Sequence, residues 1–455
     1  MALRHGLPAV MLAICLGAGF SLAADAPPVK LVVGVDEAVS RALAQAPELG
    51  ESQADIALAQ SKLTEAGAYR FPRIEFLSLM GPAPQAHKQD FGTADTGYGV
   101  SHLTWFASGD LLLTQPLYTF GKISENMKAA GFGIEVDRAK KEQRRNEIAQ
   151  KVREYYYGLL LAREMKGLIE EVQGHLESAR SSAKRLLAQE SPNVDEMDLY
   201  KLDAFSGEAT KFLNQADGGE QLALAALRVR LGLSPDADLD VSDEHLTLDE
   251  TGVRELSLYL ADAELRRPEY RQIREGLKAR ASLVEAAQAS FYPDIFLGAF
   301  YSAAYSPGRD KINNPYVTDT MFRHNWGGVA LGVKWHLDFG ITEAKVAAEQ
   351  AQYERLLKTR EYAAVNIPLQ VKKYQLELME AKQSAESMKT AWTNARKWTV
   401  AAVANFDFGL GPAREIFDGL QNYARMKGEY FQTLYNYRLA QANLMLATGQ
   451  APGDK

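Results

Sequence analysis

The side chains that could do chemistry are histidines and carboxylates, but their spacing matches no enzyme. The histidines beyond the first residues are scattered and lack the HExxH spacing of a zinc site: His87, His102, His175, His245, His324 and His336. No GxxxxGK[ST] segment offers a phosphate loop, and Asp338-Phe-Gly340 lacks the partner motifs of a kinase. Paired carboxylates fall on expected helix faces and helix breaks, where solvated charge is common. We therefore expect no enzyme, metal site or cofactor.

The first residues predict a secretory signal over residues 1–24. Arg4 gives a basic start, an apolar stretch follows, and small residues near Ala24 offer a cleavage site. A membrane anchor is one alternative, and lipidation of Cys15, the only cysteine, is another. Cleavage would leave no cysteine for a disulfide or a thiolate metal site. With 51 Lys and Arg against 58 Asp and Glu, the chain lacks the basic footprint of nucleic-acid binding.

Two halves of the chain, residues 31–232 and 252–449, follow one plan. Matching segments recur at offsets between 217 and 221 residues, and they include Pro47-Glu48 with Pro268-Glu269, Thr119-Phe-Gly121 with Asp338-Phe-Gly340, and Pro192-x-x-Asp195-x-x-Asp198 with Pro412-x-x-Glu415-x-x-Asp418. Long-period self-similarity is interpreted before local features. It indicates that each half supplies an equivalent wall of one symmetric object.

Each half is expected to hold a helix, a strand pair, a very long helix, a break and a further helix, so the fold class is mainly α with a small β part. The expected helices span 35–67 (with Asp36 as N-cap), 121–189, 194–231, 271–290, 340–404 and 413–447. The expected division is a signal at 1–24, a first repeat at 25–232 (β-hairpin 73–118, coiled-coil helices 121–231), a connecting segment at 233–251, a second repeat at 252–449 (β-hairpin 294–337, coiled-coil helices 340–447) and a tail at 450–455.

Four strands are expected, at 73–80, 109–118, 294–305 and 326–337. In the last one, Val329, Leu331 and Val333 alternate with small or polar residues, which makes one face apolar. Aromatic residues gather near the strand ends, as they do at membrane interfaces, and they include Trp105, Tyr118, Tyr292, Tyr301, Trp326 and Trp335. Four strands cannot close a water-filled barrel. Either they form a small soluble sheet or several subunits pool their strands.

The last helix carries a heptad pattern. Its apolar positions are Ile416, Leu420, Tyr423, Tyr430, Leu434, Tyr437 and Leu444. Lys427 and Gln441 interrupt this 4-3 spacing, which is otherwise typical of a coiled-coil seam. Beyond the signal, no segment has 18 consecutive apolar residues, so we expect no transmembrane helix.

Three stretches carry a family resemblance. They are Arg267-Pro-Glu-Tyr270 followed by Ala289-Ser-Phe-Tyr-Pro293, Trp335-His-Leu-Asp-Phe-Gly340 leading into Glu343-Ala-Lys-Val-Ala347, and Phe408-Gly-Leu-Gly411 through Ile416-Phe-Asp418. In this order and spacing, and with the duplication, they resemble the TolC-like outer-membrane efflux channels. The resemblance covers nearly the whole mature chain.

The resemblance implies a homotrimer in the cell outer membrane. Each subunit would give four strands to one 12-stranded β-barrel, which an α-helical barrel continues through the periplasm. It also implies a passive exit duct of a tripartite efflux or type I secretion system, with outer-membrane lipid, a periplasmic adaptor and an inner-membrane pump as partners. The alternative is a soluble periplasmic coiled-coil scaffold or adaptor. The alternating, aromatic-ended strands argue against that alternative.

In that family the periplasmic tip is the gate, and the resemblance assigns roles there. Arg414 aligns with the latch cation, Asp418 with a ring aspartate, and Asp198 is the repeat-equivalent latch partner. Three copies of Asp418 near one axis would repel each other and attract cations. The alternative for these carboxylates is stabilisation of a helix start. Gln421 stands where the family has a second ring carboxylate, so the resemblance does not carry a doubled acidic ring. Because only the second tip carries an arginine, we expect the second hairpin to be the moving one.

Overall fold

The computed structural model describes residues 30–85, 103–191, 194–249, 252–309, 321–408 and 410–450. The expected signal with Cys15, the end of the expected tail, and Pro192 of the first helix break lie outside the described residues.

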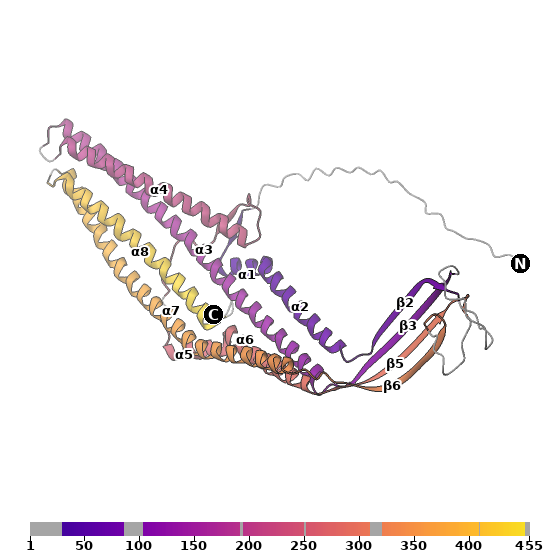
Figure 1. The fold of residues 1–455 in the computed structure, drawn as a ribbon. Coiled ribbons are helices and arrows are strands. Elements are labelled where there is room, and N and C mark those ends of the chain that lie inside the picture. The colour runs from indigo at the N-terminus through magenta and orange to yellow at the C-terminus, as the bar shows by residue number, and fades with distance from the viewer. Residues whose placement is uncertain are drawn as a thin grey trace, which may run out of the picture.

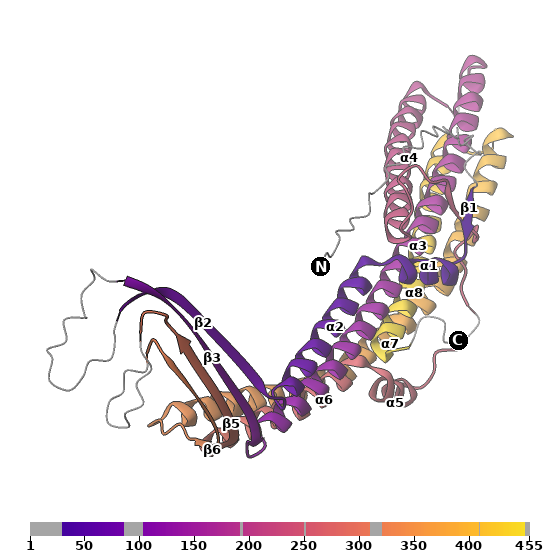
Figure 2. The ribbon, with the colours of Figure 1, turned by 90° about the vertical axis from the view of Figure 1, so that its right-hand side faces the viewer.

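The molecule is elongated, with a β-sheet at one end and two helix tips at the other (Figure 1). Two helices of 67 residues, α3 (Lys122–Ala188) and α7 (Ile341–Asp407), run along its length. The shorter helices α2 (Pro47–Ala68) and α6 (Pro268–Gln288) lie on the sheet side (Figure 2), whereas α4 (Glu196–Arg230) and α8 (Ala413–Thr448) pair with the long helices near the tips. The predicted fold class, mainly α with a small β part, is confirmed.

A glycine with a left-handed backbone begins each long helix. Gly121 and Gly340 have φ angles of 97° and 113°, which only glycine adopts readily. In the second repeat, Asp338 accepts hydrogen bonds from the backbone N–H and the hydroxyl of Thr342, at 2.7 and 2.8 Å. The segment Asp338-Phe-Gly340 therefore forms the turn that leads from the preceding strand into α7.

The first helix of each repeat is broken at a proline, which the sequence analysis missed. The expected helix 35–67 is two helices, α1 (Val35–Gln45) and α2. The expected helix 271–290 is preceded by α5 (Leu256–Arg266), and α6 begins three residues earlier than predicted. A residue before proline avoids the helical region, and Ala46 and Arg267 are both extended. Gly34, and not Asp36, is the N-cap of α1.

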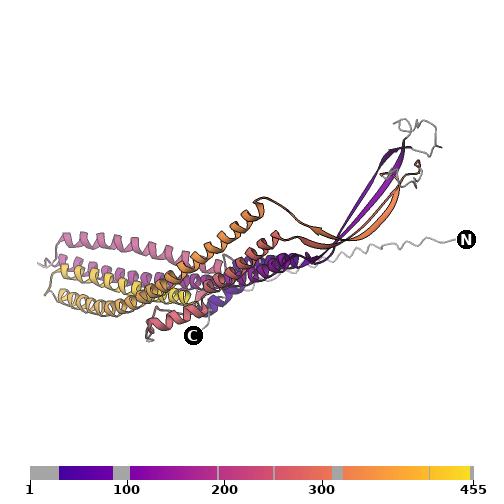
Figure 3. The same ribbon diagram turned by 60° about the horizontal axis from the view of Figure 1, so that its bottom comes forward.

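Four strands form one antiparallel sheet in the order β2-β3-β5-β6. They are β2 (Arg73–Pro84), β3 (Leu103–Tyr118), β5 (Asp294–Tyr305) and β6 (His324–Lys334). β2 and β3 are longer than predicted, and β6 ends three residues before the predicted end. Because β3 pairs with β5, the two repeats share one sheet, which curves away from the helices (Figure 3).

A second, two-stranded sheet was not predicted. The strand β1 (Leu31–Val33) pairs in parallel with β4 (Leu239–Val241), which lies in the segment that connects the repeats. Each strand has three residues, too few to show a period-two pattern.

The large sheet has two different faces, which the pairing register defines. The face that we call apolar carries exposed side chains that include Ile74, Phe76, Met80, Leu111, Leu297, Val329, Leu331 and Val333. The face that we call polar carries, among apolar residues, Glu75, Asp110, Thr114, Ser302, His324 and Lys334. The alternation predicted for the last strand is therefore present. No helix within the described residues is long and apolar enough to cross a membrane.

Glycines on the polar face lie under aromatic rings of the neighbouring strand. A Cβ atom added to Gly332 would lie 2.3 Å from Cζ of Phe296, and one added to Gly328 would lie 3.1 Å from Cζ of Phe300. The rings occupy the space that the missing side chains leave, and they fix the register of β5 against β6.

We predict that Gly332→Ala lowers the melting temperature of the protein, because the added methyl group displaces the Phe296 ring at a cost of about 1–3 kcal/mol. Gly133→Ala is the control, since Gly133 lies in α3 with open space around it. It should leave the melting temperature unchanged or raise it. Equal melting temperatures for Gly332→Ala and the unchanged protein would contradict the packing role.

Candidate functional site

The second tip, between α7 and α8, brings two of the predicted gate residues together. Nε of Arg414 lies 3.7 Å from Oδ2 of Asp418, one helical turn away, and both side chains are at least half exposed. Pro412, the N-cap of α8, has no capping side chain. The tip therefore presents an exposed ion pair, a contact that contributes little to stability by itself.

The predicted latch partner has another role within the single chain. Asp198 forms a capping box with Asp195 at the start of α4, and its Oδ1 lies 3.2 Å from Nζ of Lys201. Such a box satisfies backbone N–H groups at a helix start. Among the contacts of the described residues, none joins Arg414 to Asp198, so their link stays a prediction for contact between chains.

A polar cluster interrupts the heptad seam of α8 at Lys427. The ammonium group of Lys427 donates to Oε2 of Glu171 in α3 at 2.6 Å and to the Tyr423 hydroxyl at 3.0 Å. The Tyr423 hydroxyl donates to Oε1 of Glu171 at 2.7 Å. The rings of Trp392 and Phe431 lie 5.9 and 5.8 Å from the ammonium group. Lys427 therefore links the second helical hairpin, formed by α7 and α8, to the first, formed by α3 and α4, through Glu171.

Electrostatics keep this cross-link charged. Burial alone would lower the pKa of Lys427, but hydrogen bonds to Glu171 and Tyr423 outweigh it and raise that pKa. Burial alone would raise the pKa of Glu171, but hydrogen bonds from Lys427 and Tyr423 lower it. Both groups therefore stay ionised at neutral pH.

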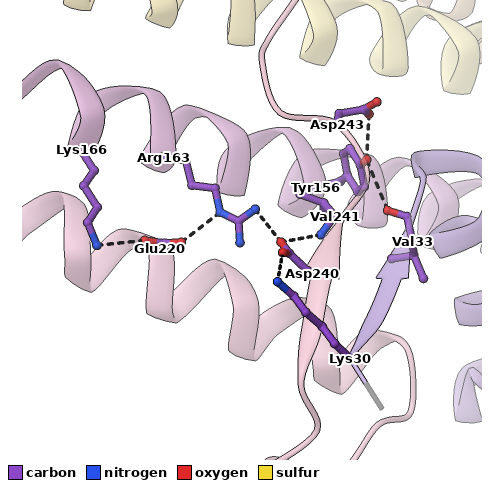
Figure 4. Close-up of polar contacts among 9 residues, drawn as sticks. All are labelled: Lys30, Val33, Tyr156, Arg163, Lys166, Glu220, Asp240, Val241 and Asp243. Carbon is purple, nitrogen blue, oxygen red and sulfur yellow. Dashed lines mark hydrogen bonds and ion pairs between the residues drawn. The ribbon is translucent and has the colours of Figure 1, made fainter. Parts of the chain in front are cut away.

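The segment connecting the repeats is held by ion pairs. Asp240 of β4 accepts from Lys30 at 2.6 Å and from Arg163 of α3 at 2.7 Å (Figure 4). Arg163 also reaches Glu220 of α4 at 3.0 Å, and Glu220 lies 3.5 Å from Nζ of Lys166. Burial alone would raise the pKa of Asp240, but the hydrogen bonds from Lys30 and Arg163 lower it to about 2. No sequence pattern indicated this network.

Two further contacts fasten the same segment. The Tyr156 hydroxyl of α3 donates to Asp243 at 2.7 Å (Figure 4), and Arg438 of α8 donates to Asp249 at 2.5 Å. Gln441, the second heptad interruption, lies 3.3 Å from the same Asp249. Both heptad interruptions therefore mark polar contacts of α8.

The predicted interface aromatics are all exposed, but they do not share one face. Trp105 and Tyr301 lie on the apolar face, and Tyr118 stands in register with Ile295 of that face. Trp326 pairs with Ser302 and lies on the polar face, where its ring meets Phe300 edge-on. The remaining two, Tyr292 and Trp335, lie just beyond the strands.

Among the described residues, no group of three or more metal-ligating side chains occurs.

The comparisons with known proteins agree with this geometry. A family model described as outer membrane efflux protein matches residues 38–189 and 259–450. The fold is similar to the outer-membrane channel OprN (16% identity, TM-score 0.76, 91% of this chain and 89% of that chain) and to the outer membrane protein VceC of Vibrio cholerae (16%, 0.75, 91% and 96%). It is also similar to the MtrE outer membrane channel of Neisseria gonorrhoeae in its open state (14%, 0.72, 99% and 98%). No individual curated protein sequence matches the chain.

We predict that Asp240→Asn destabilises the protein at pH 7 by about 1–3 kcal/mol, because Lys30 and Arg163 lose their charged partner. The folded-state pKa of Asp240, about 2, lies below its usual 3.8, so its contribution is complete above about pH 4 and is lost as the pH falls towards 2. Melting temperatures measured from pH 7 to pH 2 should therefore fall less steeply for Asp240→Asn. Asp236→Asn, in the exposed turn before β4, should behave like the unchanged protein.

Proposed function

The chain belongs to the outer membrane efflux protein family, and from this premise we propose that three copies form the exit duct of a tripartite efflux or type I secretion system. As a member of this family, the protein is an outer-membrane channel that reaches into the periplasm, and not an enzyme. The finer points, namely the trimer, its partners and its gate, are supported by features of the single chain.

The sheet supports assembly from several copies. Its outer strands β2 and β6 each pair on one side only within the described residues, and exposed strand edges recruit further strands. The four strands of one chain cannot enclose a pore, whereas three copies of the chain would supply twelve strands. The exposed apolar face would then meet lipid and the polar face would line the lumen. This open sheet with one apolar face is the observation that carries the proposal.

The helices also have apolar surface that a single chain leaves uncovered. On α7 it recurs at near-heptad spacing, with side chains 49 to 69% exposed: Tyr362, Val365, Leu369, Leu376 and Met379. On α4, Leu222 and Val229 are more than 70% exposed. Heptad-spaced apolar stripes pack against other helices. Neighbouring copies would cover these stripes and continue the duct as an α-helical barrel.

A groove along the paired helices supports a helical partner. Its volume is about 690 Å³, and α3, α4 and α8 line it with apolar residues that include Leu161, Met165 and Phe212. Arg425 and Glu429 stand at the same groove. An amphipathic helix of a periplasmic adaptor fits such a surface. The inner-membrane pump would supply the energy, since the duct is passive.

A membrane fractionation decides between this proposal and the soluble scaffold. We expect the mature protein to stay in the outer-membrane fraction through high-salt washes, to dissolve only in detergent, and to have the mass of three chains. A protein that high salt releases without detergent would contradict the channel. A detergent-soluble monomer that conducts no current would contradict the trimeric duct alone.

We further propose that Arg414 and Asp418, with Asp198 of a neighbouring copy, close the tip. Arg414→Ala combined with Asp418→Ala should raise single-channel conductance in planar bilayers and weaken its sensitivity to divalent cations, because the tip loses its links and its acidic ring. Glu415→Ala is the control, since Glu415 lies in the same turn and its side chain contacts only the Trp398 indole, at 3.5 Å, among the described contacts. Unchanged conductance of the double variant would remove these gate assignments.

A further inference from the structure

A cavity of about 1300 Å³ lies where the sheet meets the helices. On the helix side it is lined by α2, α3 and α6, of which α3 packs against both others (Figure 2). On the sheet side it is lined by residues that include Thr114 and Pro116 of β3, Phe296 of β5 and Lys334 of β6. These four residues share the polar face of the sheet in the pairing register. The cavity therefore opens on the side that would face the lumen in the trimer proposed above.

The floor of the cavity is one face of α3. The lining residues of this helix are spaced three or four positions apart, at Asn126, Ala129, Gly133, Val136 and Lys140. The middle of this strip is small and apolar. A Cβ atom added to Gly133 would find no heavy atom within 4 Å, so the space above the floor is open. A flat apolar molecule has room there, since drug-sized ligands occupy sites of about 300–1,000 Å³.

Two lysines flank one carboxylate at the sheet end of the cavity. Lys122 donates to both carboxylate oxygens of Asp294, at 2.8 and 2.9 Å. Lys334 stands directly opposite Asp294 in the register of β5 and β6. Within the described residues, no ion pair engages Lys334, whose side chain is exposed. This end of the cavity therefore carries one positive charge more than its carboxylate balances.

The remaining charges of the lining leave that excess in place. Lys140 pairs with Asp137 at 2.9 Å, and Arg280 pairs with Glu349 of α7 at 3.2 Å. Lys62 and Glu65 of α2 are both exposed and of opposite sign. The cavity is thus slightly positive, although the chain as a whole has a formal charge of −7. A cleft with an excess of one charge attracts ligands of the opposite sign.

We propose that this cavity binds small amphipathic anions on their way through the duct, an inference that rests on the trimeric channel proposed above. The apolar body of such a molecule covers Ala129, Gly133 and the Phe296 ring, and its anionic group meets the ammonium group of Lys334. Contact with the apolar floor gives the attraction, and the charge-assisted contact with Lys334 gives the preference for anions. A cation of the same shape meets the excess positive charge and binds more weakly.

The test measures single-channel currents in planar bilayers at neutral pH, with naphthalenesulfonate as the probe. This anion has a flat apolar body and one negative group, and we expect it to block the current of the unchanged channel. Sulfate lacks the apolar body, and naphthylmethylammonium carries the opposite charge. Each of these should need a concentration at least roughly fivefold higher for half of the block.

Two variants test the two parts of the site separately. Lys334→Gln should raise the half-blocking concentration of naphthalenesulfonate roughly fivefold, because the anionic group loses its charged partner. Gly133→Phe should raise it by at least as much, because the new ring fills the open floor. Lys345→Gln is the matched control, since Lys345 is an exposed lysine near the start of α7 that does not line the cavity. It should leave the half-blocking concentration unchanged.

Each outcome bears on one claim. Trimer mass and conductance without the probe show whether a variant has folded, and Lys334→Gln tests the site independently of Gly133→Phe. An unchanged half-blocking concentration in Lys334→Gln would overturn the inference, as would an equal block by naphthylmethylammonium. A protein that forms no conducting trimer would overturn the proposed function instead.

Discussion

The pairing of β3 with β5 is the interaction on which the rest of the structure depends. It is the strand contact that joins the first repeat to the second, from Ala107 to Tyr118 on one side. Because α3 begins four residues after β3 and α6 ends shortly before β5, the same pairing sets α3 beside α6. Lys122 and Asp294, 2.8 Å apart, add an ion pair at this junction. Without the pairing of β3 with β5, each repeat would hold an isolated two-stranded hairpin, and such a hairpin is only marginally stable in water.

Duplication gives the chain two hairpins of one design but with unequal tips. The first tip starts α4 with a reciprocal capping box, worth about 1 kcal/mol per cap. The second starts α8 without a capping side chain and exposes its ion pair. Further along α8, Lys427 is fixed to Glu171 of the other hairpin. The stretch of α8 between its tip and Lys427 therefore has fewer polar links to the first hairpin, and the movement of the second hairpin stays a prediction.

The sequence predicts the long elements well because each depends on local composition. A proline-free run rich in helix formers gives α3, and turn signals bound the four large strands. Some of the errors are local in origin. Pro47 and Pro268 stand at the first turn of a helix, where proline is tolerated, so composition alone hides the break before them. Other errors are not local: the ion pairs of Asp240 with Lys30 and Arg163 join segments far apart in the chain, and no spacing along the chain encodes them.

The connecting segment ties the two hairpins together between the tips and the sheet. It is the stretch of chain that links the repeats, and ion pairs hold it at Asp240 and Asp249 to helices of both hairpins. The side chains of these pairs are 14 to 34% exposed, so removing one partner would leave the other partly desolvated and without a charged partner. These pairs fasten the middle of the chain to both hairpins, between the tips at one end and the sheet at the other.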